Sequence, residues 1–160
     1  MAGLFANAQE ANIRSCVSMI EDVLASLGHS PDLSRVPGKD TYPAWRVQKG
    51  SAHVFILLDG VAGENFLRIT APVIHVDPAA DKVGLYQKLL ELNRTEVYGA
   101  AFALDGSVVV LTSQRSTTDL DRSEVLDLVK RVEEYADKYD DLLVDEFGGR
   151  SAGLSVLPVT

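Results

Sequence analysis

Apolar residues recur at helical spacing in three separate segments of the 160-residue chain. The first segment places its apolar residues on one stripe and stops at Gly28, which suits the left-handed end of a helix. A cysteine on such a stripe is usually a small core residue rather than a reactive thiol, so we expect Cys16 in the core. The stripe consists of Ile13, Cys16, Val17, Ile20, Leu24 and Leu27.

The middle segment predicts a helix that opens within residues 77–81, where Asp suits the N-cap and Pro the first helical position. Its apolar residues cover about half of the helix circumference, more than a helix on a single sheet needs. This width indicates a second contact surface, supplied either by another helix of the same chain or by a partner. The residues concerned are Val83, Leu85, Tyr86, Leu89, Leu90 and Leu92.

The last helix is predicted to begin at Asp121, because Asp121 and Glu124 have the spacing of a capping box. Apolar residues then follow in steps of four and three, which favours a helix lying on a sheet over a short heptad seam. Gly148 and Gly149 are expected to end this helix. The apolar positions are Val125, Val129, Val132, Ala136, Tyr139 and Leu143.

Five strands are predicted between these helices, at residues 44–49, 53–58, 65–69, 97–104 and 108–112. The second strand is apolar on both faces, which indicates that both faces are covered. Asp105-Gly106 predicts a tight type I′ hairpin between the last two strands. Gly99, Ala101 and Ala103 form a small-residue face that would let a helix approach. Pro72 is expected at an edge or a bulge, since it cannot donate to the ladder.

The element order is therefore α-β-β-β-α-β-β-α, a single α+β domain with a five-stranded antiparallel sheet over residues 1–149. The proline-rich connector, residues 29–43, is expected to continue neither helix nor strand and to be either a packed loop or a mobile one. Residues 150–160 have little to anchor them and are expected to form a mobile tail.

The chain carries 15 Lys and Arg against 23 Asp and Glu, a net charge of −8. Such a chain is repelled by nucleic acids and by anionic membrane surfaces, so we expect neither as a partner. The single cysteine permits no internal disulfide, and the N-terminus lacks the pattern of a signal peptide. A cytoplasmic protein is expected.

Residues with catalytic or metal-binding chemistry are scattered. His29, His53 and His75 fall on a loop and two strands, so no metal site, cofactor site or catalytic residue is predicted. His75 and Asp77 are two residues apart and could act as a base and its orienter, but this spacing is more typical of an ordinary pair at a strand end. A non-enzymatic protein is expected.

Three segments resemble the YbjN-like family, bacterial proteins described as sensory transduction regulators. The segments are the helix end at residues 86–93, the hairpin at 102–109 and the helix that begins Asp121-Arg-Ser-Glu-Val125 and reaches residues 135–139. The fold of that family is similar to the dimeric chaperones of type III secretion. The resemblance implies a homodimer that binds segments of client proteins and performs no covalent chemistry.

Two functional classes remain open from the sequence. One is a dimeric chaperone-like or regulatory protein that holds extended segments on its sheet edge and helix grooves. The other is a small-molecule sensor or an enzyme with a pocket near Trp45, His53 and His75. The scarcity of paired polar residues favours the first class.

The middle helix is the expected dimer interface, because a symmetric pair could cover its apolar half. One assignment gives the row Leu85, Leu89 and Leu92 to the partner. The other apolar row, Val83, Tyr86 and Leu90, then faces the chain's own sheet. The opposite assignment also remains open.

Overall fold

The computed structural model describes residues 2–38, 42–61 and 63–153, with side chains from residue 8 onward. Four helices and seven strands lie within these ranges. The elements, in chain order, are α1 (Ala2–Ser26), α2 (Pro31–Ser34), β1 (Arg35–Val36), β2 (Ala44–Lys49), β3 (Ala52–Val61), β4 (Glu64–His75), α3 (Lys82–Thr95), β5 (Ala101–Asp105), β6 (Val108–Ser116), α4 (Arg122–Phe147) and β7 (Arg150–Ser151).

The strands form one antiparallel sheet in the order β1-β2-β3-β4-β6-β5, with β7 added beside β4. The predicted α+β class and antiparallel sheet are confirmed. The five expected strands correspond to β2 through β6, and β1 and β7 add two residues each. Strands this short carry no periodicity that a sequence pattern could reveal.

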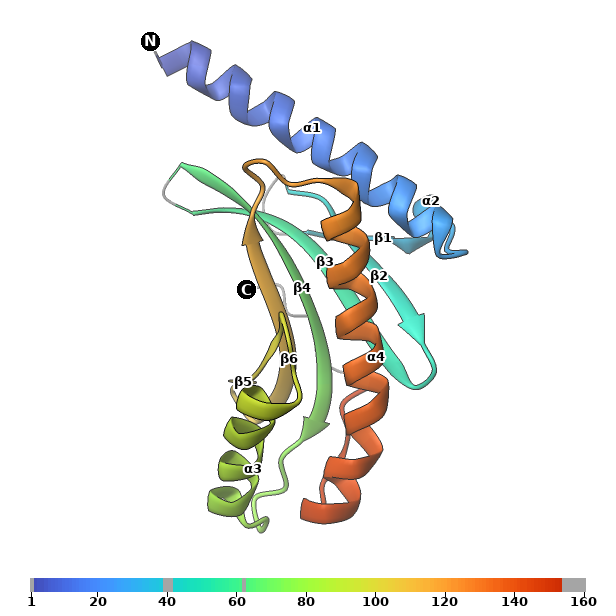
Figure 1. The fold of residues 1–160 in the computed structure, drawn as a ribbon, viewed down its shortest axis with the longest axis vertical. Coiled ribbons are helices and arrows are strands. Elements are labelled where there is room, and N and C mark those ends of the chain that lie inside the picture. The colour runs from blue at the N-terminus through green and yellow to red at the C-terminus, as the bar shows by residue number, and fades with distance from the viewer. Residues whose placement is uncertain (1, 39–41, 62, 154–160) are drawn as a thin grey trace.

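One face of the sheet carries the main core. Figure 1 shows α4 running along the sheet while α1 crosses one end of it. Strand pairing aligns Trp45 with Ile56 and Ile56 with Ile69, so these side chains share the face beneath the helices. All six residues of the predicted α4 stripe are buried, and Cys16 lies in the same core. Fully burying an aliphatic or aromatic side chain of this kind contributes about 1.5–3 kcal/mol.

The opposite face, here called the outer face, also carries buried apolar residues. Phe55 is 0% and Leu57 6% exposed, and they cluster with Ala44 and Val36. A second small cluster contains Val108, Val110 and Ala152. The prediction that β3 is covered on both faces is therefore confirmed.

Several predicted boundaries need correction. The helix α3 begins at Lys82 and takes Asp81 as its N-cap, because the Asp81 carboxylate accepts from the Gly84 N–H at 3.0 Å. Asp77 instead closes a turn, in which its carbonyl accepts from the Ala80 N–H at 3.0 Å. The strand β5 begins only at Ala101. Ala103 is exposed on it, so no helix covers that part of the small-residue face, whereas Gly99 lies beside the Arg131 side chain of α4.

The hairpin between β5 and β6 is present, but its two-residue loop is Gly106-Ser107, because Asp105 still pairs with Val108. Gly106 has a φ of +56°, whereas Ser107 has no positive φ. This pattern fits a type II′ turn with glycine at its first central position rather than the expected type I′ turn. Pro72 lies beside a register shift in the pairing of β4 with β6, as predicted.

The connector and the C-terminal boundary also differ from expectation. Residues 31–36 of the connector form α2 and β1, while residues 39–41 lie outside the described part. The domain does not end at Gly149, because Arg150 and Ser151 pair with β4 and Ala152 is 2% exposed. The rest of the expected tail, residues 154–160, lies outside the described residues.

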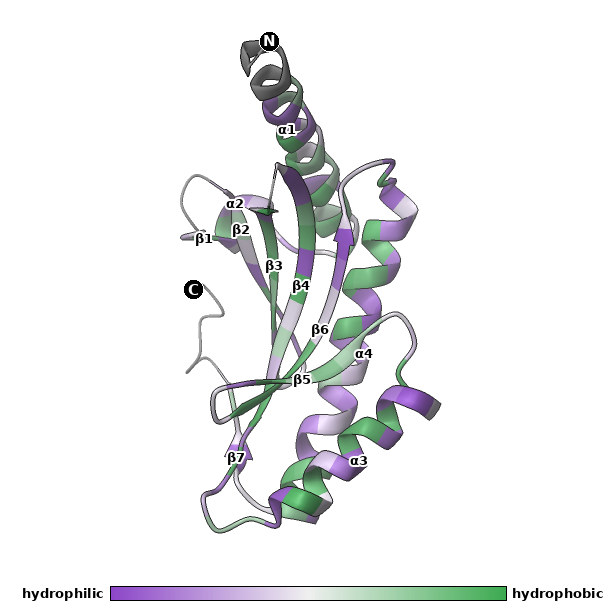
Figure 2. Cartoon of the chain, turned by 90° about the vertical axis from the view of Figure 1, so that its left-hand side faces the viewer, coloured by the Kyte–Doolittle hydropathy of each residue, from purple (hydrophilic) through white to green (hydrophobic). Residues whose placement is uncertain are grey.

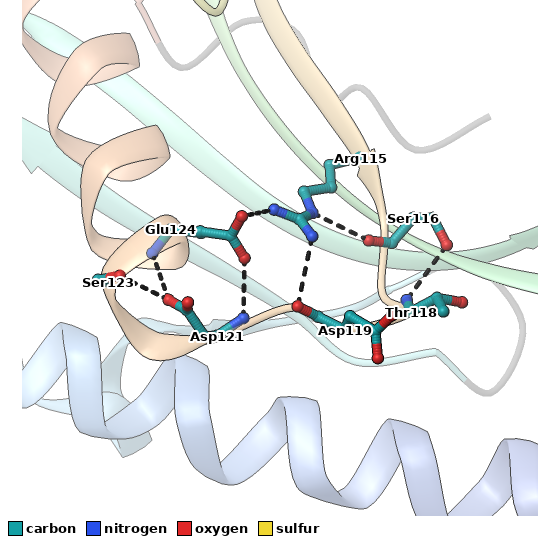
Figure 3. Close-up of polar contacts among 7 residues, drawn as sticks. All are labelled: Arg115, Ser116, Thr118, Asp119, Asp121, Ser123 and Glu124. Atoms are coloured by element: carbon teal, nitrogen blue, oxygen red, sulfur yellow. Dashed lines mark hydrogen bonds and ion pairs between the residues drawn. The ribbon is translucent and has the colours of Figure 1, made fainter.

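The start of α4 is fixed by the polar network of Figure 3. The Asp121 carboxylate accepts from the Glu124 N–H at 2.9 Å, and Glu124 accepts from the Asp121 N–H at 3.0 Å, which completes the predicted capping box. Arg115 on β6 forms an ion pair with Glu124 and donates to the carbonyl of Asp119 at 3.4 Å. The network joins the end of β6 to α4, which sets the position of the helix on the sheet.

Candidate protein-interaction surface

The two apolar rows of α3 differ sharply in exposure. Leu85, Leu89 and Leu92 are 0%, 5% and 4% exposed and belong to the main core. In the other row Val83 is 78% and Leu90 69% exposed. The row Leu85, Leu89 and Leu92, which one assignment gave to a partner, is therefore covered by the chain's own core.

We call the exposed residues Val83, Tyr86 and Leu90 the α3 outer row. They lie three and four residues apart, so they form one continuous strip along the helix. Figure 2 shows α3 beside α4 on one side of the sheet. A contiguous strip of exposed apolar and aromatic residues on one helix makes this face a candidate for a protein contact.

Two polar contacts hold α3 at a fixed angle. Asn93 donates to the Phe102 carbonyl at 3.2 Å and accepts from the Phe102 N–H at 2.7 Å. Lys88 lies 3.6 Å from the Glu146 carboxylate on α4. The helix is thereby tied both to β5 and to α4, so its outer row has a defined orientation.

The end of α3 is tied to α4 by a second group of side chains. The Tyr139 hydroxyl donates to the Glu96 carboxylate at 2.7 Å, and the Lys138 ammonium lies 3.1 Å from the same oxygen. These hydrogen bonds, that of Tyr139 first, lower the pKa of Glu96. The Tyr139 ring packs edge-on against Phe102 of β5 at 5.5 Å between centroids.

The edges of the sheet are short. The strand β5 is last in the order, and within the described residues it pairs with β6 alone. Asn93 already occupies the N–H and carbonyl of Phe102, which shortens the open edge further. At the other edge β1 pairs only with Trp45 and Ala44 of β2. Residues 46–49 of β2 therefore do not pair with β1. Both edges offer at most a few residues for the addition of a strand.

The three residues of the alternative pocket lie apart. Trp45 is buried among the core residues of the inner face, where its indole N–H donates to Glu21 at 3.3 Å. His53 pairs with Gln48 on the outer face, and burial followed by the charge of Arg46 lowers its pKa. His75 lies at the far end of β4. The geometry therefore does not combine these residues into one site.

His75 and Asp77 do line one open pocket of about 430 Å³, together with Ser107 and Arg150. Asp77 also accepts from the Ala79 N–H at 2.8 Å, which stabilises the turn before α3. His75 is half-buried at the strand end. Asp77 thus serves the turn before α3, as expected for an ordinary pair at a strand end rather than for a base and its orienter.

Neither a metal site nor a membrane helix emerges from the residues that the structure describes. No group of three or more His, Cys, Asp and Glu side chains is close enough to hold a metal ion there. None of the helices in these ranges combines the length and the apolar character that crossing a bilayer requires. Burial raises the pKa of the Cys16 thiol, which makes it a weak nucleophile.

Glu133 and Asp140 are two buried carboxyl residues of α4 that the sequence did not reveal, and Glu133 is the one whose pKa is shifted. It lies on α4 with its side chain 5% exposed, and its Oε1 atom is 3.7 Å from the Nε2 atom of His29. Among the described residues this oxygen has no hydrogen-bond partner. Burial raises the pKa of Glu133, while the charges of His29 and Lys49 act in the opposite direction.

We expect Glu133→Gln to raise the melting temperature near pH 7 and to change it little near pH 4. A carboxyl whose folded pKa is raised supports stability fully below its unfolded pKa, and this support is lost as the pH rises through the folded pKa. Glutamine is neutral throughout. Thermal melts from pH 4 to 8 test this, with the exposed Glu134→Gln as control. Parallel pH profiles for wild type and Glu133→Gln would contradict it.

Comparisons with known proteins identify the family to which the chain belongs. The profile of a family of peptide-binding chaperones, described as "T3SS (YopN, CesT) and YbjN peptide-binding chaperone 1", matches residues 15–153. The chain belongs to this family, and its predicted resemblance to YbjN-like proteins and type III secretion chaperones is confirmed. No curated protein matches the sequence.

A solved structure supports the fold independently. A chain in the crystal structure of the ExsC-ExsE complex superposes with a TM-score of 0.61 at 16% sequence identity. The match covers 81% of this chain and 94% of the other. At this identity the likeness establishes the fold, namely helices packed on an antiparallel sheet as in that protein.

Proposed function

We propose that this protein is a non-enzymatic, homodimeric chaperone or regulator that binds segments of client proteins. The observation that carries the proposal is the match of residues 15–153 to the peptide-binding chaperone family. The likeness of its fold to a chain of the ExsC-ExsE complex supports the same interpretation.

The proposed dimer uses the α3 outer row. Val83, Tyr86 and Leu90 are exposed although they are apolar or aromatic, and a two-fold axis near them would bury each row against its copy. The row that faces the core contributes to the fold and not to this contact. The proposal therefore keeps α3 as the interface helix and exchanges its two rows.

We expect Leu90→Glu to convert a dimer into a folded monomer, because a charge is costly only where a partner excludes water. Sedimentation velocity at tens of micromolar, on the order where micromolar dimers assemble, measures the assembly, and far-UV circular dichroism checks the fold. Leu33→Glu makes the same substitution at a leucine of α2 that is 87% exposed, so it is the matched control and should remain dimeric. A wild-type protein that sediments as a monomer, or a Leu90→Glu protein that stays dimeric, would refute the interface.

Client binding is tested by affinity capture from lysate of the native organism, followed by mass spectrometry. A specific client should be recovered with the tagged wild-type protein and not with the tag alone. Overlapping synthetic peptides of the recovered protein should then compete for binding. Failure of every peptide to compete, with the folded partner binding normally, would exclude recognition of extended segments.

A further inference from the structure

The cap at the end of α1 holds His29 in a defined position. Gly28 has a φ of +88°, the left-handed conformation that often ends a helix. The His29 N–H donates to the carbonyl of Leu24 at 3.0 Å, and the Gly28 N–H donates to the carbonyl of Ala25 at 3.1 Å. These two hydrogen bonds are those of a Schellman motif, which fixes the direction of the chain after the helix.

His29 lies beside a buried carboxyl group of α4. Its Nε2 atom is 3.7 Å from the Oε1 atom of Glu133, and the two side chains are 24% and 5% exposed. Among the described residues this oxygen accepts no hydrogen bond. The distance is too long for a hydrogen bond, but it is short enough for an ion pair when the imidazole carries a proton. The strength of this contact therefore depends on protonation.

The next acidic side chains of α4 that face the sheet are engaged differently. Asp137 accepts from the Ser51 N–H at 3.3 Å, and Asp140 accepts from the hydroxyl of the same serine. Both carboxylates thereby hold the turn between β2 and β3. Glu133 instead has its Oε1 atom facing the imidazole of His29, so it connects α4 to the end of α1.

The charged groups around Glu133 come from three elements. His29 follows α1, Lys49 ends β2, and Glu134 is the next residue of α4. Lys49 and Glu134 are exposed, so water screens their charges, whereas His29 is half-buried. Burial raises the pKa of Glu133, and the charges of His29 and Lys49 oppose this effect. His29 is therefore the partner whose charge matters most for the buried carboxyl.

A rise in pH removes the favourable states of this contact. Histidine ordinarily loses its charge between about pH 5 and 8. A carboxyl whose folded pKa is raised supports the closed contact at low pH, and this support is lost as the pH rises through the folded pKa. Above that pH Glu133 is a buried anion beside a neutral imidazole, which is costly. Movement of the end of α1 relieves this cost, because it admits water to the carboxylate.

The part of α1 concerned covers apolar residues of α4. Val23 and Leu24 are 0% exposed and belong to the same core as Val129 and Val132 of α4. The end of α1 is anchored beyond these residues by its cap and by the contact of His29 with Glu133. Loss of that contact weakens the cover of the apolar surface.

We propose that His29 and Glu133 form a proton-dependent latch, which closes the end of α1 on α4 at low pH and releases it as the pH rises. Release exposes the apolar side chains of Val23 and Leu24 together with the surface of α4 that they cover. Use of this surface by a client rests on the proposed function, whereas the latch itself does not.

Hydrogen exchange of the full chain at pH 5.5 and pH 8, corrected for the intrinsic rate at each pH, tests the latch. Residues 20–29 should exchange through local opening, with lower protection than residues 66–71 of β4, which report global unfolding. We expect this local opening to be at least about fivefold more frequent at pH 8. Equal opening at the two pH values, or protection of residues 20–29 as high as that of β4, would overturn the proposal.

Two substitutions separate the latch from other effects of pH. Glu133→Gln has no charge to bury, and His29→Lys keeps a cation at pH 8, so each should make the opening of residues 20–29 independent of pH. Glu134→Gln, which changes an exposed neighbour, should keep the pH dependence of the wild type. Far-UV circular dichroism checks that each variant is folded. A wild-type pH dependence in either folded latch variant would refute the proposal, whether or not a client exists.

Discussion

Leu89→Glu is expected to lower the free energy of unfolding by about 3–5 kcal/mol, the range of severe core substitutions. Leu89 is 5% exposed and lies in the main core with Leu85 and Leu92. The substitution removes an aliphatic side chain and places a carboxylate where water cannot solvate it. Since a domain of this kind is stable by about 5–15 kcal/mol, the variant would be close to unfolding.

The neighbouring Leu90→Glu is the matched comparison, because it makes the same chemical change one residue away. Leu90 is 69% exposed, so its replacement should change the stability of the isolated chain by less than about 0.5 kcal/mol. Urea unfolding followed by circular dichroism measures both variants, each at a concentration too low for a dimer to contribute. Similar midpoints for the two variants would mean that the rows of α3 are not arranged as described.

The orientation of α3, that is, which of its two rows faces the core, could not be predicted from the sequence. Periodicity predicted the helix and its wide apolar surface, but both rows consist of apolar or aromatic residues, so their spacing could not identify the buried one. The choice depends on contacts with residues far along the chain. Asn93 binds both backbone groups of Phe102, and Lys88 approaches Glu146. These contacts turn Leu89 inward, and a local pattern cannot contain them.

The ends of helices were predicted well where the signal was complete and local. Asp121 and Glu124 form the capping box because both halves of that motif lie within four residues. At α3 two aspartates, Asp77 and Asp81, stand four residues apart, and each suits an N-cap. The structure uses the second for the helix and the first for a turn. Only the packing of α3 on its neighbours decides between them.

The outer face illustrates a partly successful prediction. The alternation in β3 indicated cover on both faces, and the burial of Phe55 and Leu57 agrees with it. The sequence did not show that Ala152 covers Val108 and Val110 on the same face, because β7, which precedes Ala152, is two residues long and exists only through its pairing with β4. A pairing between residues that lie 75 to 77 positions apart leaves no pattern in the local sequence. The expected end of the domain at Gly149 failed for that reason.

The dimer proposal depends on the same contacts that fix α3. Tyr139 lies between the two segments that hold this helix: its ring packs on Phe102 of β5, and its hydroxyl binds Glu96 just after α3. The side chain is 3% exposed. A cavity at this position would loosen both attachments together. Tyr139 therefore connects α4 both to β5 and to the residue that directly follows α3.

Tyr139→Ala is expected to cost about 3–5 kcal/mol in the free energy of unfolding, the range for loss of a buried aromatic side chain. Tyr139→Phe keeps the ring and its contact with Phe102 and removes only the hydrogen bond to Glu96. That bond contributes about 0.5–1.5 kcal/mol, so the Phe variant should remain well folded. Urea unfolding separates the two costs.

Hydrogen exchange measured by mass spectrometry then locates the effect of the two substitutions. The Ala variant should lose protection in residues 82–105, which include α3 and β5, before the α1 region changes, because the cavity opens where these elements meet α4. The Phe variant should retain protection there. Equal costs for the two variants would mean that the hydroxyl rather than the ring holds α3. An Ala variant with unchanged exchange in residues 82–105 would show that α3 keeps its orientation without Tyr139.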